Sequence, residues 1–304
     1  MRHKPAAAMA KLCTEQRNPR TRRLDLGSAF EIARLINAED AKVAGAVKKV
    51  LPQIARAIDA IAKALHDGGR LIYVGTGTSG RLGALDAAEC PPTFSSNPES
   101  VQFVIAGGIK ALGRAVEANE DSRAAGRADL ARRKPGKNDV VVGISASGRT
   151  PYTVAAVEYA RSRGASTVGI TCNRGSPLER VAKIPIVIDV GPEVVTGSTR
   201  MKAGTAQKMV LNTLTTGAMA RLGYAYGNLM VNLHLKNSKL VERGIRILQQ
   251  VTDLDRHESV KALGAAGGRV PIALLMVKHH ATRTQAEGLL KNAKGNIRKA
   301  LREE

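Results

Sequence analysis

Tryptophan is absent from this sequence, and aromatic residues make up only 3% of its 304 residues. Hydrophobic residues nevertheless reach 43%, so the chain can bury a core that is built mainly from Ala, Val, Leu and Ile. No uninterrupted apolar run approaches the ~20 residues of a membrane-spanning helix. The basic N-terminal residues are not followed by an adequate apolar stretch, so we expect neither a signal peptide nor a membrane partner.

Cysteine is also scarce. The sequence has only Cys13, Cys90 and Cys172, an odd number of widely separated residues that suggests no disulfide framework. This usage is typical of the reducing cytoplasm, where we expect the protein to be located. No cluster of His, Cys, Asp or Glu has metal-ligand spacing, so the sequence predicts no metal site.

Acidic residues are few: 26 Asp and Glu stand against 47 Lys and Arg, which gives a formal net charge of +21. Such an excess of positive charge is found in many nucleic-acid-binding proteins. Here, however, the basic residues are spread along the whole chain, the aromatic residues that stack on single strands are missing, and no helix-turn-helix or zinc-finger spacing occurs. We therefore expect no nucleic-acid partner and interpret the charge as a basic surface that attracts anionic substrates.

The order of expected elements predicts a doubly wound α/β domain with a five-stranded parallel sheet. Residues 28–66 read as helices, beginning with a capping box of Ser28 and Glu31. After Asn228 no credible strand follows, and short amphipathic helices are expected. The expected strands are 71–74, 101–105, 140–144, 167–171 and 184–190, with helices at about 80–90, 111–133, 151–163, 176–182 and 199–222. The expected domains are an N-terminal helical segment (1–56), the α/β domain (57–230) and a small helical domain (238–304).

Two strand-to-helix junctions have similar compositions. The run 71–74 leads into Gly-Thr-Gly-Thr-Ser-Gly-Arg at 75–81, and the run 140–144 leads into Ser-Ala-Ser-Gly-Arg-Thr-Pro at 145–151. Such loops suit phosphate, because glycine lets the backbone approach the anion and the N–H groups at the helix start point at it. We therefore expect a sugar-phosphate site. The expected phosphate ligands are Thr78, Ser79, Ser145, Ser147 and Thr150.

The first loop also matches the pattern G-x-G-x-x-G, which on its own is weak evidence for a dinucleotide-binding site. A dinucleotide site needs an acidic residue at the end of the next strand to hold the ribose. That strand ends at residues 104–108 without an acid, and the second loop would have no role in such a site. A tight turn without any ligand is the remaining alternative, but two such loops at one sheet edge favour an anion.

Three further groups of residues could carry chemistry. Glu89 ends the helix after the first loop, where two prolines are expected to stop it, and Glu117, Glu120 and Asp121 cluster on an expected helix. By residue type alone, both groups are ordinary surface charges. The segment 191–205 brings hydroxyls and two cations to a helix start, and is either a third anion contact through Ser198 and Lys202 or an ordinary capped loop.

Several long motifs resemble the N-acetylmuramic acid 6-phosphate etherases, which are sugar-isomerase (SIS) domain proteins related more distantly to the vertebrate glucokinase regulator. The resemblance covers most of residues 14–231, and the tail resembles that family's small three-helix, ubiquitin-associated-type domain. Thr76 stands where the family often has Ala, and the family does not explain the basicity. The motifs are LIYVGTGTSGRLGALDAAECPPTF (71–94), AGG (106–108), VVVGISASGRTPY (140–152), GPEVVTGSTRMKAGTAQK (191–208) and TGAMARLGYAYGNLMV (216–231).

The resemblance implies cleavage of the lactyl ether of N-acetylmuramic acid 6-phosphate, with Glu89 and Glu120 as the catalytic acids and without metal or cofactor. It also implies a homodimer, because SIS domains commonly pair. A phosphosugar isomerase and a non-catalytic sugar-phosphate sensor of the same class remain alternatives. An unbroken helix from Gly80 to Glu89 would separate the two ends by about 14 Å. A site within one chain would then require a short or bent helix, or a substrate that lies along the helix. We predict instead that a second chain supplies Glu89 to the phosphate loops.

Overall fold

The computed structural model describes residues 12–116, 119–233, 235 and 237–302. The chain forms two compact units. The first unit comprises Met1–Ala87 and Glu99–Thr215, and the second comprises Ala88–Pro98 and Thr216–Glu304.

The first unit is built on a five-stranded sheet in the order β2-β1-β3-β4-β5, and every pair of neighbouring strands is parallel. Its strands are rich in Val and Ile and largely buried, as expected for a sheet that helices cover on both faces. The predicted α/β fold is therefore confirmed. The strands are β1 (Leu71–Gly75), β2 (Val101–Ile105), β3 (Val140–Ile144), β4 (Ser166–Thr171) and β5 (Ile184–Val187).

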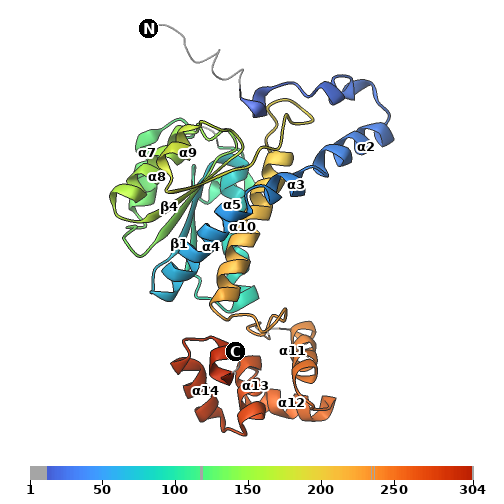
Figure 1. Cartoon of the computed structure of the whole chain (residues 1–304), viewed down its shortest axis with the longest axis vertical. Coiled ribbons are helices and arrows are strands. Elements are labelled where there is room, and N and C mark those ends of the chain that lie inside the picture. Colours follow the sequence, from blue (N-terminus) through green and yellow to red (C-terminus); the bar gives the residue numbers. More distant parts are fainter. Residues whose placement is uncertain (1–11, 117–118, 234, 236, 303–304) are drawn as a thin grey trace. The chain divides into compact units, whose positions relative to one another are not determined.

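Helices lie on both faces of this sheet (Figure 1). On one face Tyr152, Ala156 and Ala160 pack against Ile72 and Val141 of the central strands. The helices of this face are α7 (Arg123–Ala131), α8 (Pro151–Ser162) and α9 (Pro177–Val181). The helices of the opposite face are α4 (Leu51–His66), α5 (Gly77–Phe94) and α10 (Lys202–Arg221).

The N-terminal part of the first unit is helical, as predicted. Helix α2 (Ala29–Asp40) begins with the expected capping box, in which Ser28 Oγ accepts the Glu31 N–H and the Ser28 N–H donates to Glu31 Oε2 at 2.8 Å. Helix α3 (Val43–Lys48) and α4 follow. Ahead of α2, short 3₁₀ turns cover the loop that follows β5, because Thr21 Oγ1 donates to the Val194 carbonyl at 2.8 Å.

Two helix predictions were wrong. Helix α5 does not stop at Pro91 and Pro92 but runs to Phe94, because proline's fixed φ is itself helical and the Ser95 N–H still bonds the Pro91 carbonyl at 2.9 Å. The helix expected at 111–133 is divided into α6 (Lys110–Gly113) and α7. The Ser122 hydroxyl caps α7 by accepting the Ala125 N–H, so residues 119–121 form a turn before that helix.

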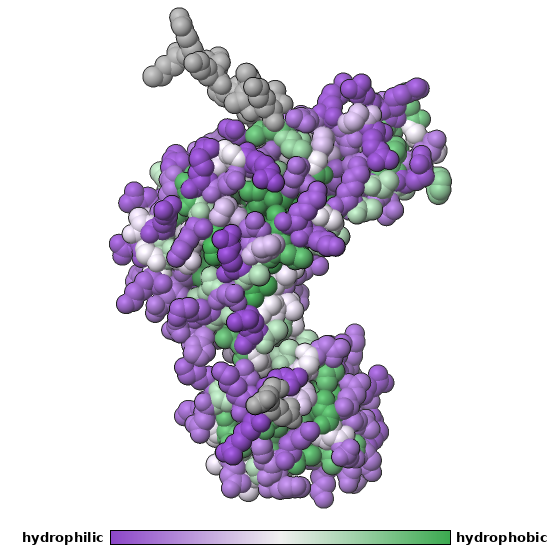
Figure 2. All heavy atoms as spheres, viewed as in Figure 1, coloured by the Kyte–Doolittle hydropathy of each residue, from purple (hydrophilic) through white to green (hydrophobic). Residues whose placement is uncertain are grey.

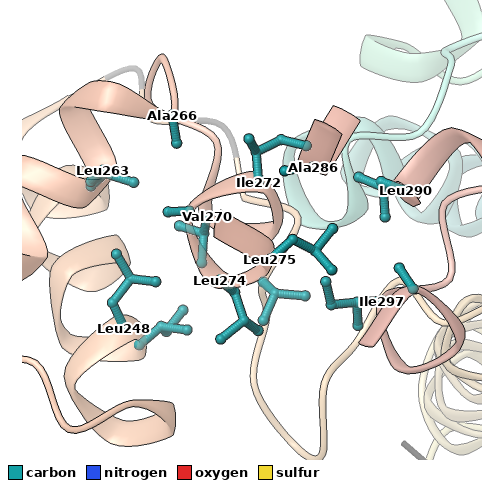
Figure 3. Close-up of a cluster of buried hydrophobic side chains, with 14 of the residues drawn as sticks. Leu248, Leu263, Ala266, Val270, Ile272, Leu274, Leu275, Ala286, Leu290 and Ile297 are labelled. Carbon is teal, nitrogen blue, oxygen red and sulfur yellow. The ribbon is translucent and has the colours of Figure 1, made fainter. Parts of the chain in front are cut away.

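The second unit has its own aliphatic core (Figure 3). Leu248, Leu274 and Leu275 are fully buried there, beside Val270 and Ile297. Residues 237–302 contain helices and no strand, as predicted, but five helices instead of the three that the resemblance implied. They are α11 (Ser238–Val251), α12 (Arg256–Ala265), α13 (Val270–His279), α14 (Arg283–Asn292) and α15 (Ile297–Leu301).

In the described part of the chain, no single helix is long and apolar enough to cross a membrane. The bent pair α12 and α13 meets the criteria of length and composition only when its two helices are taken together.

Candidate active site

The two Gly- and Ser-rich loops leave the sheet side by side. Gly75 ends β1 directly opposite Ile144, the last residue of β3, so both loops start at the same level of the carboxyl edge. The strand order reverses between these strands, since β2 lies on one side of β1 while β3, β4 and β5 follow on the other. Open α/β sheets bind ligands at this kind of switch point.

The first loop is tightly folded. The Gly80 N–H donates to the Thr76 carbonyl at 3.0 Å, and a Cβ added to Gly80 would lie 2.6 Å from Ile105 Cγ1. Gly77 begins α5 with a φ of +49°, a conformation that favours glycine. The first N–H groups of α5 have no acceptor within the helix, so they can serve an anion at this edge.

The second loop gathers hydroxyl groups. Ser145 Oγ lies 2.9 Å from Thr150 Oγ1 and 3.4 Å from Ser147 Oγ, and it accepts the Gly148 N–H at 3.1 Å. Thr150 precedes α8 without capping it, so its hydroxyl belongs to this cluster. The structure therefore brings together the three hydroxyl residues that the sequence predicted for this loop.

Helix α10 meets the first loop. A Cβ on Gly204, in the first turn of α10, would lie 3.5 Å from Thr78 Cγ2. One turn further along, Gln207 Oε1 accepts a hydrogen bond from Ser79 Oγ at 2.9 Å, and both side chains are buried. Sequence reasoning missed Gln207, although it lies in the motif 191–208.

The amine of Lys202, a predicted substrate ligand, is only 1% exposed and lies 2.7 Å from Glu39 Oε2 of α2. Burial alone would raise the pKa of Glu39, but hydrogen bonds from Lys202 and Lys42 lower it to about 2. The backbone N–H of Lys202 donates to the buried carboxylate of Glu193 at 3.0 Å. Ser198, the other predicted substrate ligand of this segment, is half-buried in the preceding loop. Desolvation raises the pKa of Glu193. Glu39 could not be identified from the sequence, because it lies 163 residues from its partner.

Glu120 lies beside the first loop. A Cβ on Gly77 would be 3.4 Å from Glu120 Oε1, so the carboxylate lies within van der Waals reach of the start of α5. The Glu120 carbonyl accepts the N–H of Tyr152, in the first turn of α8, at 3.1 Å. The turn that carries Glu120 is thus attached to the helix that the second loop opens. Its sequence neighbour Glu117 lies outside the described residues.

Glu89 is exposed and belongs to the stretch of α5 that lies in the second unit. One turn earlier, the buried carboxylate of Asp86 accepts hydrogen bonds from Tyr73 Oη at 2.7 Å, Asn212 Nδ2 at 2.6 Å and Thr215 Oγ1 at 3.1 Å. Three donors from β1 and α10 therefore fix this part of α5. Sequence reasoning treated Asp86 only as a neighbour of Glu89.

Among the described residues, no group of three or more His, Cys, Asp and Glu side chains could hold a metal ion. The side chains that lie at the two loops include several hydroxyls, the carboxylate of Glu120 and the amide of Gln207. This set can bind an anion and can move a proton.

Residues 53–161 match the model of the glucokinase regulatory protein N-terminal SIS domain, and residues 132–217 match that of the SIS domain. The chain is 51% identical to N-acetylmuramic acid 6-phosphate etherase of Photobacterium profundum, covering 96% of this chain and 97% of that one. It is 51% identical to the Edwardsiella ictaluri etherase, with the same coverages, and 48% identical to etherase 1 of Bacillus licheniformis, covering 96% of each chain. The chain therefore belongs to the N-acetylmuramic acid 6-phosphate etherase family.

Proposed function

We propose that this protein cleaves the D-lactyl ether of N-acetylmuramic acid 6-phosphate with water, giving N-acetylglucosamine 6-phosphate and D-lactate. The observation that supports this most strongly is the position of the Glu120 carboxylate, which lies beside Gly77 of the first loop. A proton-transfer group next to a phosphate-binding loop suits a reaction on a sugar phosphate.

The substrate's phosphate binds across the two loops. The phosphate oxygens accept hydrogen bonds from the hydroxyls of the second loop, from the hydroxyls of Thr78 and Ser79, and from the first N–H groups of α5. Ser198 adds a contact to the rest of the substrate. Lys202 is a weaker candidate for direct contact because its amine is paired with Glu39.

The reaction proceeds by elimination and addition. Opening of the sugar ring exposes an aldehyde at C1, which makes the hydrogen on C2 acidic. A base removes this proton while an acid protonates the lactate oxygen at C3, and the C3–O bond breaks to leave an unsaturated aldehyde. Water then adds at C3 and a proton returns to C2. The aldehyde accepts the electron pair, so the residues need only transfer protons.

We assign Glu120 as the base at C2 and Glu89 as the acid that protonates the departing lactate. Each group reverses its role when water adds. Glu120 is half-buried beside the phosphate loop, as a base near the reacting carbon should be.

We further propose that the site is shared between two copies of the chain. Helix α5 is unbroken from Gly77 to Phe94, so Glu89 lies about 14 Å along the axis from Gly80, at ~1.5 Å per residue. The C6 phosphate and C3 oxygen of one sugar are much closer together, so Glu89 of a second copy completes the site. Exposed apolar side chains support pairing: Phe30 is 76% and Leu26 is 68% exposed. Figure 2 shows hydrophobic residues at the surface of the segment that carries α2.

The three cysteines of the chain are free, which suits a protein of the reducing cytoplasm. We therefore propose that the reaction takes place there.

Incubation of the protein with N-acetylmuramic acid 6-phosphate, followed by an enzymatic assay of D-lactate, tests the proposed activity. We expect D-lactate and N-acetylglucosamine 6-phosphate in equal amounts, and none with a Glu120→Gln control. Tight binding without lactate would instead identify a sugar-phosphate sensor. An aldose–ketose conversion without lactate would identify an isomerase.

A further inference from the structure

The buried pair of Ser79 and Gln207 joins the first turn of α5 to the second turn of α10. Ser79 Oγ and Gln207 Oε1 are 2.9 Å apart. In this arrangement the serine hydroxyl donates its single hydrogen inward, to the amide oxygen. Gln207 Nε2 is buried and has no hydrogen-bond partner among the described residues.

This arrangement conflicts with a role of Ser79 in holding a phosphate. A phosphate dianion offers only acceptors, so a hydroxyl must donate to it. The hydroxyl of Ser79 has one hydrogen, which is already given to Gln207.

A flip of the Gln207 amide about its Cγ–Cδ bond removes this conflict. The oxygen and nitrogen of a glutamine amide exchange places with almost no change in shape. Nε2, which now lacks a partner, would then donate to Ser79 Oγ, and the hydroxyl hydrogen would be released toward the loop. Only an amide offers both arrangements, because a carboxylate accepts but does not donate.

We propose that Gln207 is a positioning residue that directs the Ser79 hydroxyl toward the substrate's phosphate by donating its amide N–H to Ser79 Oγ. The inference rests on the proposed phosphate role of Ser79. Phosphate binding and the turned amide stabilise each other, so the side chain switches between an empty-site and an occupied-site arrangement.

Two variants test this role. Gln207→Met keeps the length of the side chain but removes hydrogen bonding, and Gln207→Glu keeps the acceptor but removes the donor. Thr213→Ala, an exposed change on α10, is the control. Dissociation constants for inorganic phosphate and for N-acetylglucosamine 6-phosphate are measured by calorimetry, with KM and kcat for the etherase reaction.

We expect both Gln207 variants to weaken binding of both probes roughly tenfold, the loss of one hydrogen bond to an anion. KM should rise by a similar factor with little change in kcat, because the phosphate is bound equally before and during the reaction. In a Ser79→Ala background the effect of Gln207→Met should disappear. A purely structural role would instead give the same loss with and without Ser79.

The outcomes separate this inference from the function on which it rests. If the unaltered protein binds neither probe, the phosphate site and the role of Gln207 are both wrong. If Ser79→Ala weakens binding but neither Gln207 variant does, only the role of Gln207 is wrong. An equal loss from Gln207→Met in both backgrounds also overturns it.

Discussion

Among the single residues of the site, Gly77 has the most constrained backbone. Its φ of +49° favours glycine, and the carboxylate of Glu120 lies beside it, since a Cβ on Gly77 would be 3.4 Å from Glu120 Oε1. The hydroxyls of the second loop are arranged around Ser145 Oγ. Most residues of the two loops are glycine, serine and threonine, so backbone groups and hydroxyls are what these loops offer to a ligand.

The two carboxylates should be separable by experiment. Glu89→Gln should still exchange the C2 hydrogen of the substrate with heavy water while releasing little lactate, because the base remains. Glu120→Gln should do neither, because no base remains to remove the proton from C2. Mass spectrometry of the recovered sugar and a lactate assay measure the two steps. The opposite pattern would reverse the roles, and full activity of both variants would remove these residues from the mechanism.

The phosphate assignment predicts a large effect of two hydroxyls. Replacing Ser79 and Ser147 together with Ala removes two donors to an anion, each worth roughly 1.5–3 kcal/mol. Binding of N-acetylglucosamine 6-phosphate should weaken by roughly a hundredfold or more. The melting temperature should fall only by what the lost hydrogen bond between Ser79 and Gln207 contributes, and the variant should stay folded. Ser162→Ala, at the exposed end of α8, is the control. Unchanged affinity in a folded double variant would rule the assignment out.

At the scale of elements, α10 connects the loops to the N-terminal helices. Its first turn lies near Thr78, since a Cβ on Gly204 would be 3.5 Å from Thr78 Cγ2, and its Lys202 makes a buried ion pair with Glu39 of α2. Further along, Asn212 and Thr215 hold Asp86 of α5. The helix that carries Glu89 and the helices before the sheet are therefore both attached to α10.

The ion pair predicts how stability depends on pH. The pKa of folded Glu39 is lowered to about 2, below its ordinary value of 4.5, so its contribution is complete above the ordinary pKa and is lost as pH falls from there toward 2. The shift corresponds to about 3 kcal/mol. Glu39→Gln should be less stable at pH 7 by roughly that amount, because Lys202 stays buried without its partner, and it should lose less stability in acid.

Denaturant unfolding between pH 2.5 and 7 measures this effect. Asp25→Asn, an exposed change in the same N-terminal part, should behave like the unaltered protein. Equal stability of Glu39→Gln and the unaltered protein at pH 7 would mean that the ion pair contributes nothing.

The strands could be predicted from the sequence because a buried parallel sheet requires short β-branched runs, and residues 140–144 and 184–187 contain little else. The two loops could be recognised as candidate phosphate-binding loops from their glycine, serine and threonine residues. The start of α7 was missed because helix-forming residues precede it, although Ser122 is a typical N-cap residue. The contacts of Lys202 and Gln207 could not be predicted either, because each depends on a partner more than a hundred residues away.

For the molecule as a whole, we predict that two copies of the chain form each site. An inactive Glu89→Gln protein mixed with an inactive Ser79→Ala, Ser147→Ala protein should regain part of the activity once subunits exchange. One site of such a mixed dimer would combine an intact Glu89 with intact loops. Activity of the mixture, with heterodimers verified by differently tagged copies, measures the effect. Proven heterodimers without activity would mean that each chain builds its own site.

The fate of the ether oxygen shows directly whether the protein releases lactate by elimination at C3. The protein is incubated with N-acetylmuramic acid 6-phosphate in oxygen-18-labelled water, and the D-lactate is analysed by mass spectrometry. Elimination at C3 leaves the ether oxygen on lactate and takes the new oxygen at C3 of the sugar from water. We therefore predict that D-lactate is released without the label and that the sugar carries it at C3. Labelled lactate, or no lactate at all, would contradict the account.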